Sequence, residues 1–435
     1  MALRFGTDGV RAEALTVLTP QYVRALGAAA AKVLDGDAFL VGRDSRESGP
    51  ELQRALAQGF RSRGVSVIDL GMVPTPAVAH MSAALGLPAA MLSASHNPWQ
   101  DNGVKLFSAG GLKLSDEDQD IIQSALDEQP SLSDPGGEIS AAEGSISAYV
   151  DAVVDSIVGR FDGLRIVLDS ANGSASATAA IIFERLGADV ISLADSPDGR
   201  NINSGVGSTH PEFLQAAVLE HNADAGFAFD GDADRITAAG SDGVIIDGDR
   251  IIAMTALDRR DTGRLADDTV VITVMANLGF RVAMQAEGIS LLETPVGDRY
   301  VLEALDAGGY TLGGEQSGHV IHRDLATTGD GVLTAVQLLD ASIRRGTGLG
   351  EWAAGVMTRY PQILENVRTD QKIPDLLERL APAIDAEEAV LGADGRVLIR
   401  ESGTEPVVRV MVEAAEEPDA RASVDRLVDA VRNLT

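Results

Sequence analysis

Three carboxylates at alternate positions, Asp230, Asp232 and Asp234, form the strongest chemical signal in the sequence. They follow a short apolar run at 226–229, which predicts a loop at the end of a buried strand. Three negative charges this close together repel one another unless a cation is present. Oxygen ligands of this kind select Mg²⁺ or a similar hard ion. An EF-hand is excluded because its sixth and twelfth loop positions are arginine and serine here. A metal site is therefore favoured over a solvated acidic turn.

A second candidate is Ser95, which precedes His96 in the segment SASHNP at 93–98. The Asn-Pro pair indicates a turn, and a serine beside a histidine in such a loop is a candidate covalent nucleophile. We expect Ser95 to lie in an exposed loop. Downstream, the segment DNGVK predicts a tight turn that returns Lys105 toward the same pocket, although an ordinary surface lysine is the simpler alternative.

A candidate phosphate clamp lies near the C-terminus, where residues 400–406 read RESGTEP. This segment offers a phosphate an arginine, two hydroxyls and a glycine that leaves the backbone amides free to donate. Arg409 can add a second guanidinium. The members of this set are Arg400, Ser402, Gly403, Thr404 and Arg409. The alternative is a hairpin turn without a ligand.

The glycine-rich segment 313–319, GGEQSGH, is the fourth candidate. Glu315 and Ser317, two positions apart, can accept from and donate to neighbouring sugar hydroxyls. His319 can assist proton transfer. The alternative is a loop whose glycines serve only backbone geometry.

The elements that must position these loops show a repeated order. Three stretches, 39–68, 165–193 and 270–292, each read as strand, polar loop, amphipathic helix and strand. Valine- and isoleucine-rich strands of this kind suit a sheet covered on both faces. The series predicts three related α/β domains. Residues 127–144 are expected to be irregular, and two strands at 397–400 and 407–412 with a final helix predict a smaller α+β module.

Composition excludes several function classes. The 435 residues contain no cysteine, which removes disulfides and thiolate chemistry, and carry a net charge of −30, which disfavours nucleic acid and anionic membranes. No apolar run is long enough for a membrane span, and the start MALRFG does not suggest the apolar stretch of a signal peptide. The sequence contains no Gly-Lys pair of a Walker A motif and no G-x-G-x-x-G after a strand. An ATP- or NAD-dependent reaction therefore has no support in the sequence.

Taken in order, these segments resemble the α-D-phosphohexomutase superfamily over essentially the whole chain, starting from FGTDGVR at 5–11. The resemblance implies three similar α/β domains with mixed sheets and a smaller C-terminal α+β phosphate-binding domain around a central cleft. We expect boundaries at 1–148, 149–250, 251–361 and 362–435. The family usually has glycine after Arg11, where this chain has Ala12.

The resemblance also assigns roles. Ser95 would carry a phosphoryl group, and Asp230, Asp232 and Asp234 would hold Mg²⁺ with the Ser95 phosphate. The residues expected around the reacting groups are Arg11, His96, Lys105, Arg235 and His319. Glu315 and Ser317 would grip sugar hydroxyls, and the Arg400 set would bind the phosphate that is not reacting.

Two segments, PVGDRYV at 295–301 and ATTGDG at 326–331, resemble the branch that acts on glucosamine phosphates. The implied reaction interconverts glucosamine 6-phosphate and glucosamine 1-phosphate through a 1,6-bisphosphate, which also primes the enzyme. Asp298 is a candidate for the C2 amine, with pairing to Arg299 as the simpler alternative. The general base is left open among His96, Lys105 and His319.

Other functions remain as alternatives: a sister mutase for glucose or mannose phosphates, a metal-dependent sugar phosphatase, and a non-catalytic sugar-phosphate sensor. The expected partners are a small phosphosugar and no nucleic acid or membrane, with a homodimer as an option for assembly. The expected location is the cytoplasm, where amino sugar would be supplied for cell-wall precursors.

Overall fold

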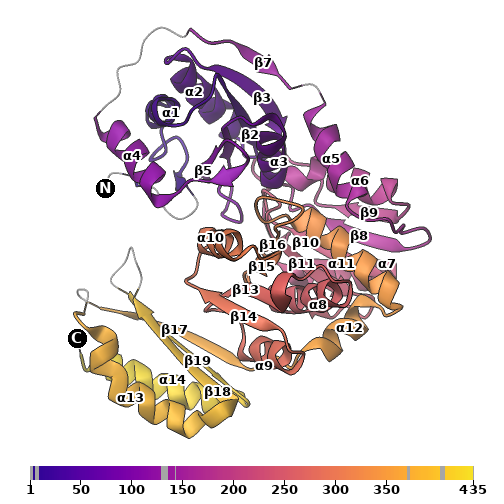
Figure 1. The fold of residues 1–435 in the computed structure, drawn as a ribbon, viewed down its shortest axis with the longest axis vertical. Helices are drawn as coiled ribbons and strands as arrows, with labels where there is room; N and C mark the ends of the chain where they lie inside the picture. The colour runs from indigo at the N-terminus through magenta and orange to yellow at the C-terminus, as the bar shows by residue number, and fades with distance from the viewer. Residues whose placement is uncertain are drawn as a thin grey trace. The chain divides into compact units, whose positions relative to one another are not determined.

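The computed structural model describes residues 3–4, 9–128, 136–142, 144–369, 373–401 and 407–434. Packing divides the chain into two compact units. The first contains residues 1–275 and 289–356, and the second contains residues 276–288 and 357–435. Figure 1 traces the elements of each unit in chain order.

The first sheet of unit 1 is mixed, with strand order β1-β5-β4-β2-β3-β7 and the short β6 beside β5. β2 lies parallel to β3 and β4, whereas β5 runs antiparallel to β1 and β4. Leu52, Leu56 and Phe60 of α2 are fully buried, and Phe60 stacks on Phe39 at 4.1 Å between ring centroids. The elements are β1 (Val10–Glu13), α1 (Pro20–Val33), β2 (Ala38–Arg43), α2 (Gly49–Arg61), β3 (Ser66–Met72), α3 (Thr75–Leu85), β4 (Ala89–Leu92), β5 (Asp101–Ser108), β6 (Leu112–Lys113), α4 (Asp116–Asp127) and β7 (Ile139–Ala141).

The second sheet of unit 1 has the order β12-β11-β10-β8-β9, in which β8, β9 and β10 are parallel and β11 and β12 are antiparallel additions. β10 is buried at every position, as expected for a strand covered on both faces. The elements are α5 (Ser145–Asp155), β8 (Arg165–Asp169), η1 (Ser174–Ala177), α6 (Ala179–Arg185), β9 (Asp189–Leu193), α7 (Pro211–His221), β10 (Ala225–Phe229), β11 (Ile236–Gly240) and β12 (Ile245–Ile246).

The third sheet of unit 1 has the order β14-β13-β15-β16, with β13 parallel to both neighbours and β16 antiparallel to β15. The elements are α8 (Gly248–Asp261), η2 (Ala266–Asp268), β13 (Thr269–Thr273), β14 (Ser290–Thr294), α10 (Asp298–Gly308), β15 (Leu312–Gly314), β16 (Val320–His322), α11 (Gly331–Arg345) and α12 (Leu349–Val356).

Three of the loops singled out for chemistry leave the carboxyl ends of strands. The Ser95 loop follows β4, the Asp230 loop follows β10, and the Glu315 loop follows β15. In open α/β sheets, ligands bind at the carboxyl ends of the strands. Each sheet of unit 1 therefore contributes one loop to a single region.

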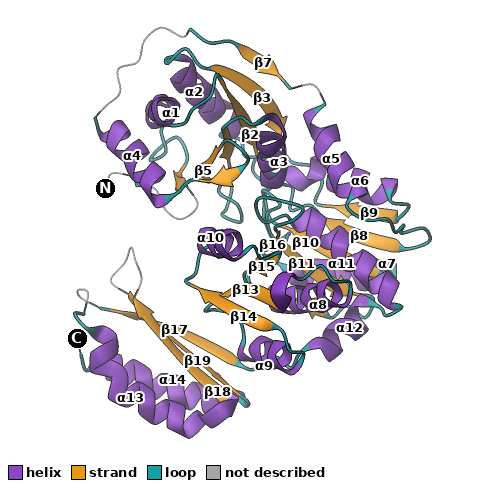
Figure 2. Cartoon of the chain, in the orientation of Figure 1, coloured by secondary structure: helices purple, strands orange, loops and turns teal. Residues whose placement is uncertain are grey.

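Unit 2 is a three-stranded antiparallel sheet of order β17-β19-β18, with α13 and α14 on one face (Figure 2). It also contains α9 (Leu278–Ala286). Asn277, which caps α9, donates to Tyr360 O and to Glu413 Oε1, both at 3.0 Å. The other elements are β17 (Gln362–Arg368), α13 (Leu376–Leu391), η3 (Gly392–Asp394), β18 (Gly395–Glu401), β19 (Val407–Ala414) and α14 (Glu417–Arg432).

Three local expectations were wrong. The 101–105 segment is not a tight turn but the start of β5, which pairs on both sides. The helix expected over 175–186 is interrupted at Thr178, where η1 gives way to α6. The stretch 127–144 contains β7, which pairs with β3 as an edge strand. Among the described residues, no helix is long and apolar enough to cross a membrane.

Candidate active site

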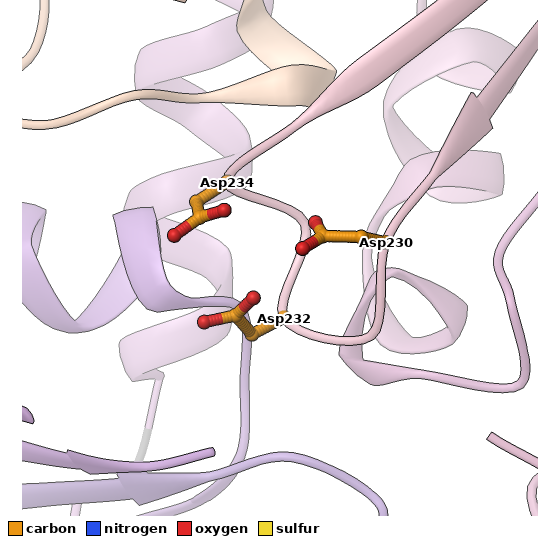
Figure 3. Close-up of side chains that lie close together, drawn as sticks. All are labelled: Asp230, Asp232 and Asp234. Carbon is orange, nitrogen blue, oxygen red and sulfur yellow. The ribbon is translucent and has the colours of Figure 1, made fainter. Parts of the chain in front are cut away.

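Asp230, Asp232 and Asp234 lie at the centre of the site, on the loop after β10 (Figure 3). Ligand oxygens from all three lie within 4.8 Å of one another, and none of the residues is more than 3% exposed. Ala233 between them has φ 59°, so the loop turns sharply enough to direct the three carboxylates to one side. Buried like charges at this separation need cations nearby.

Lys105 on β5 is one such cation, and it comes from a different sheet. Its Nζ lies 2.8 Å from Asp232 Oδ2 and 2.9 Å from Asp234 Oδ2. Burial alone would raise the pKa of Asp234, but Lys105, His319 and Arg235 outweigh it and hold that pKa well below its usual range. Burial, together with the two neighbouring carboxylates, raises the pKa of Asp230 well above its usual range. A negative charge on all three carboxylates is therefore unfavourable unless a further cation joins Lys105.

The triad fits a divalent cation. Asp232 Oδ1 and Asp234 Oδ1 are buried without a hydrogen-bond donor, whereas the second oxygen of Asp232 is used by Lys105 and by Thr75 Oγ1 at 2.6 Å. A buried carboxylate oxygen without a donor is costly, and a metal ion would satisfy both. These aspartates can hold a metal ion whose ligands are oxygens.

Ser95 directs its hydroxyl at this triad, donating a short hydrogen bond to Asp230 Oδ2. The expected exposed loop was wrong: Ser95 is only 1% exposed because residues from two sheets enclose it. Its φ is 52°, a left-handed conformation that costs a non-glycine residue about 1–3 kcal/mol and persists only where its surroundings enforce it. The serine and the acidic loop thus form one buried centre.

His96 and Arg235 lie beside this centre. His96 Nδ1 is 3.4 Å from Ser95 Oγ and 3.3 Å from Arg235 Nη1, while Arg235 N donates to Asp230 Oδ1 at 3.1 Å. Burial, followed by the charges of Arg235 and Arg11, lowers the pKa of His96 to about 4, so the ring is neutral near pH 7. Arg11 lies on β1, and Ala12 continues the regular pairing of that strand with β5.

Pockets for small ligands typically measure about 300–1,000 Å³, and a cavity of about 420 Å³ adjoins the triad within unit 1. Its lining combines basic and acidic side chains. The residues that line it are Arg4, Gly9, Arg11, Asp234, Arg235, Val296, Gly297, Asp298, Glu315 and His319.

His319 lies between two carboxylates at the wall of this cavity. Its Nδ1 is 3.7 Å from Asp234 Oδ1, and its Nε2 is 3.5 Å from Asp298 Oδ2. Gly329 packs directly against the imidazole. A Cβ at that position would lie only 2.4 Å from His319 Cε1, so a larger residue would not fit. The ring is therefore fixed within reach of both the triad and the cavity.

Asp298 and Arg299 do not form the ion pair with each other that was the simpler alternative. Asp298 forms a close ion pair with Lys113 of β6. Arg299 instead binds both oxygens of Asp116, at 2.5 and 2.7 Å. It is not among the described residues that line the cavity.

Glu315 and Ser317 lie on the turn between β15 and β16. Glu315 lines the cavity, and its Oε1 accepts from Gly297 N at 3.1 Å. Ser317 Oγ lies 3.5 Å from Glu315 Oε2 and is exposed. The turn thus ties the 296–298 loop to the residues expected to grip sugar hydroxyls.

In unit 2, Arg400 and Arg409 are directly opposite each other on β18 and β19. Like charges at opposed positions are unfavourable unless an anion lies between them. Burial and the charge of Arg409 lower the pKa of Arg400. The other members of this set, Ser402, Gly403 and Thr404, lie outside the described residues.

Several residues at the centre carry no motif that sequence reasoning recognised. Thr75 and Lys113 resemble ordinary helix and strand residues in the sequence. The best missed signal was the charged segment RDSRES at 43–48, which begins at the last residue of the parallel strand β2. It contains Arg46, a buried arginine that reaches the Ser95 loop.

Comparison with known families identifies the class. Models of the phosphoglucomutase/phosphomannomutase family match alpha/beta/alpha domain I at residues 2–132, domain II at 147–243, domain III at 247–360 and the C-terminal domain at 364–430. The chain therefore belongs to the phosphoglucomutase/phosphomannomutase family. This confirms the resemblance and the predicted fold class.

Individual relatives narrow the class further. The phosphoglucosamine mutase of Thermobifida fusca is 50% identical over 444 residues, covering 100% of this chain and 99% of the relative. That of Frankia casuarinae is 48% identical over 449 residues, covering 99% and 98%.

Solved structures agree on the fold. A phosphoglucomutase/phosphomannomutase family protein from Burkholderia thailandensis is 27% identical, with a TM-score of 0.82 over 98% of this chain and 97% of that one. The N-acetylphosphoglucosamine mutase of Aspergillus fumigatus, solved with GlcNAc-6P and magnesium, is 19% identical, with a TM-score of 0.73 over 100% and 96%.

The acidic loop generates a direct test. Asp232→Asn removes one of three negative ligands, so we expect Mg²⁺ affinity to fall at least ~10-fold and turnover to fall with it. Calorimetric titration of both proteins measures the affinity. Asp242→Asn, which removes one exposed carboxylate from the same sheet region, is the charge-matched control and should bind as wild type does. Equal affinities for Asp232→Asn and wild type would mean that the loop is only an acidic turn.

Proposed function

We propose that this protein interconverts glucosamine 6-phosphate and glucosamine 1-phosphate through a phosphoserine at position 95. The observation that carries the proposal is the hydrogen bond from the Ser95 hydroxyl to Asp230 of the buried triad, beside a cavity of sugar-phosphate size. Relatives that are 48–50% identical over their full length and are called phosphoglucosamine mutase support the choice of sugar.

The reaction consists of two phosphoryl transfers. In the first, the bond between phosphorus and Ser95 Oγ breaks and a bond from phosphorus to the sugar 1-hydroxyl oxygen forms, while that hydroxyl gives its proton to a base and Ser95 Oγ takes up a proton. The product is glucosamine 1,6-bisphosphate. After the sugar turns over, the bond between phosphorus and the 6-oxygen breaks and a bond from phosphorus to Ser95 Oγ forms. The Ser95 hydroxyl gives its proton to a base, the 6-oxygen takes up a proton, and glucosamine 1-phosphate leaves. A catalytic amount of sugar 1,6-bisphosphate would prime an unphosphorylated enzyme.

Asp230, Asp232 and Asp234 would hold one Mg²⁺, with an oxygen of the Ser95 phosphate as a further ligand. When bound, this ion would offset charge on the phosphoryl oxygens. Lys105 and Arg235 contribute further positive charge at the same centre. We assign Lys105 this electrostatic role, because its ammonium is already engaged by two carboxylates.

The base is assigned by position. His319 lines the substrate cavity, so we assign it to the sugar hydroxyl. His96 is neutral and 3.4 Å from Ser95 Oγ, so we assign it to the serine hydroxyl in the return transfer. Arg11 and Arg235 would bind the reacting phosphate from the cavity wall.

The substrate is held by two further sets. Glu315 and Ser317 would grip sugar hydroxyls, Asp298 would face the C2 amine, and Arg299 would hold the Asp298 loop through its pair with Asp116. The phosphate that is not reacting would bind the opposed arginines and the loop between them, namely Arg400, Ser402, Gly403, Thr404 and Arg409.

The remaining expectations stay as proposals: domain boundaries at 148, 250 and 361, a cytoplasmic location, and a homodimer as an option for assembly. The absence of cysteine is compatible with a reducing compartment. Supply of amino sugar for UDP-N-acetylglucosamine and peptidoglycan would follow from the proposed product.

The first test concerns the nucleophile. Ser95→Ala removes the oxygen that carries the phosphoryl group, so we expect the fold to remain and mutase turnover to be lost almost entirely. Phosphorus NMR with glucosamine 6-phosphate, Mg²⁺ and a catalytic amount of bisphosphate measures turnover. Ser82→Ala, a buried serine of α3 outside the site, is the control. Turnover of Ser95→Ala within a few-fold of wild type would contradict the assignment.

The second test concerns the phosphate clamp. Lysine cannot reproduce the two parallel hydrogen bonds of a guanidinium, so Arg400→Lys should raise the Michaelis constants of both monophosphates by roughly 10-fold or more. Both should rise because each phosphorylated end uses the clamp in turn. Arg421→Lys, on α14, should change neither. A rise confined to one monophosphate would argue against a shared clamp.

The third test concerns sugar choice. If Asp298 contacts the C2 ammonium, Asp298→Asn loses a charge-assisted hydrogen bond worth about 1.5–3 kcal/mol, or roughly 10- to 150-fold in the glucosamine-to-glucose ratio of kcat/KM. Competition between the two sugar phosphates measures the ratio. Glu315→Gln should lower both activities and leave the ratio unchanged. An unchanged ratio in Asp298→Asn would place discrimination elsewhere, and a wild type that prefers glucose or mannose phosphate would favour the sister activity.

The same NMR experiment distinguishes a sugar phosphatase from a mutase. Water attack on the phosphoserine would release inorganic phosphate at a rate comparable with isomerisation. Transfer to sugar would release almost none.

A further inference from the structure

Arg46 is a buried arginine behind the Ser95 loop. It is 1% exposed, and it comes from the loop that follows β2 rather than from any segment assigned to the reaction. A guanidinium is always charged and carries five N–H donors in a fixed plane. Burial of such a group is costly unless every donor is satisfied.

All five donors of Arg46 have acceptors. Nε donates to Asp44 Oδ2 at 2.8 Å. Nη2 donates to the carbonyls of Ser95 and Asn97, both at 2.8 Å, and Nη1 donates to the carbonyls of Asp101, at 2.9 Å, and of Pro98. Four of the five hydrogen bonds therefore go to backbone carbonyls within residues 95–101.

The amide side of Ser95 is held by the same network. Asp44 Oδ2 also accepts from Ser93 Oγ at 2.7 Å. Ser93 Oγ in turn accepts from Ser95 N at 2.8 Å. Arg46 N closes the arrangement by donating to Asp44 Oδ1 at 3.1 Å. Both the N–H and the C=O of Ser95 are thus fixed by groups that lead back to Arg46.

Asn203, from the segment after β9, grips the same carbonyls from the other side. Its Nδ2 donates to Ser95 O at 2.9 Å and to Asn97 O at 3.1 Å. Gly231 packs against Ser95 O as well, since a Cβ there would lie 2.7 Å from that oxygen. The loop is therefore clamped between two sheets of unit 1.

We infer that Arg46, assisted by Asn203, is the positioning residue that holds Ser95 in its left-handed conformation and so directs the Ser95 oxygen at the Asp230 triad. The inference rests on the proposed function, because it assigns Arg46 a role in the transfer that Ser95 carries out. Arg46 does not line the substrate cavity, and its donors are fully used by Asp44 and the loop. It acts through Ser95 and not on the substrate.

A residue that positions the nucleophile affects transfer and leaves substrate binding unchanged. We therefore expect Arg46→Lys to lower kcat by ~10- to 100-fold with KM within ~3-fold of wild type, because three donors with different geometry cannot satisfy five acceptor contacts. Incubation with glucose 1,6-bisphosphate followed by intact mass measurement should also show slower phosphorylation of Ser95.

Arg259→Lys is the matched control. Arg259 is equally buried and binds Asp324, away from the Ser95 loop. We expect it to lose stability in a thermal melt and to keep the kcat of wild type per folded molecule. If Arg46→Lys and Arg259→Lys lose stability alike and both keep wild-type kcat and phosphorylation rate, Arg46 is structural only and the inference is overturned.

A second pair decides the matter if Arg46→Lys does not fold. Asn203 and Asn222 both have positive φ, at 57° and 48°, so glycine suits both positions. Asn203→Gly removes the side-chain donors to the Ser95 loop and should lower kcat ~3- to 10-fold at constant KM. Asn222→Gly, at the end of α7, should not change kcat. Equal kcat for the two variants would overturn the inference.

These outcomes are distinct from a failure of the proposed function. If wild type does not isomerise glucosamine phosphate, the function is wrong whatever the variants do. If wild type isomerises it and both Arg46→Lys and Asn203→Gly match their controls, only the positioning role is wrong.

Discussion

The crowding of three buried carboxylates is the constraint on which the rest of the structure depends. Asp230, Asp232 and Asp234 come from one sheet, whereas Lys105 and Ser95, which contact them, come from another. Because the cluster needs positive charge from its neighbours, it also joins the two sheets at the point where the proposed reaction occurs. His319 adds the third sheet to the same centre.

Chemistry at this centre depends on a backbone that does not relax. Ser95 is held in a left-handed conformation by hydrogen bonds to both of its backbone groups, so the position of its oxygen is set by the fold before any ligand binds. On the substrate side, the cavity beside the triad is lined by charged side chains of both signs, which suits the proposed phosphosugar that binds in two orientations.

Local patterns predicted the parts of this site that stand close together in the sequence. The acidic loop could be found because it follows a short apolar strand, and the serine loop because a serine precedes a histidine and an Asn-Pro turn. Arg400 and Arg409 could be paired because they flank a short loop between two strands. Contacts made across long separations could not be found in this way. The Lys113–Asp298 pair joins residues far apart in the chain, and Ser95 was expected to be exposed because nothing in SASHNP reveals that Arg46 encloses it.

The central claim is that Ser95 gives its phosphoryl group to a sugar and takes one back. It is tested most directly by mixing the fully phosphorylated protein with one equivalent of glucosamine 6-phosphate and following phosphorus NMR over a single turnover. The account predicts that glucosamine 1,6-bisphosphate and glucosamine 1-phosphate appear while total sugar-bound and serine-bound phosphate stays constant. Loss of phosphoserine matched by an equal amount of inorganic phosphate would contradict it.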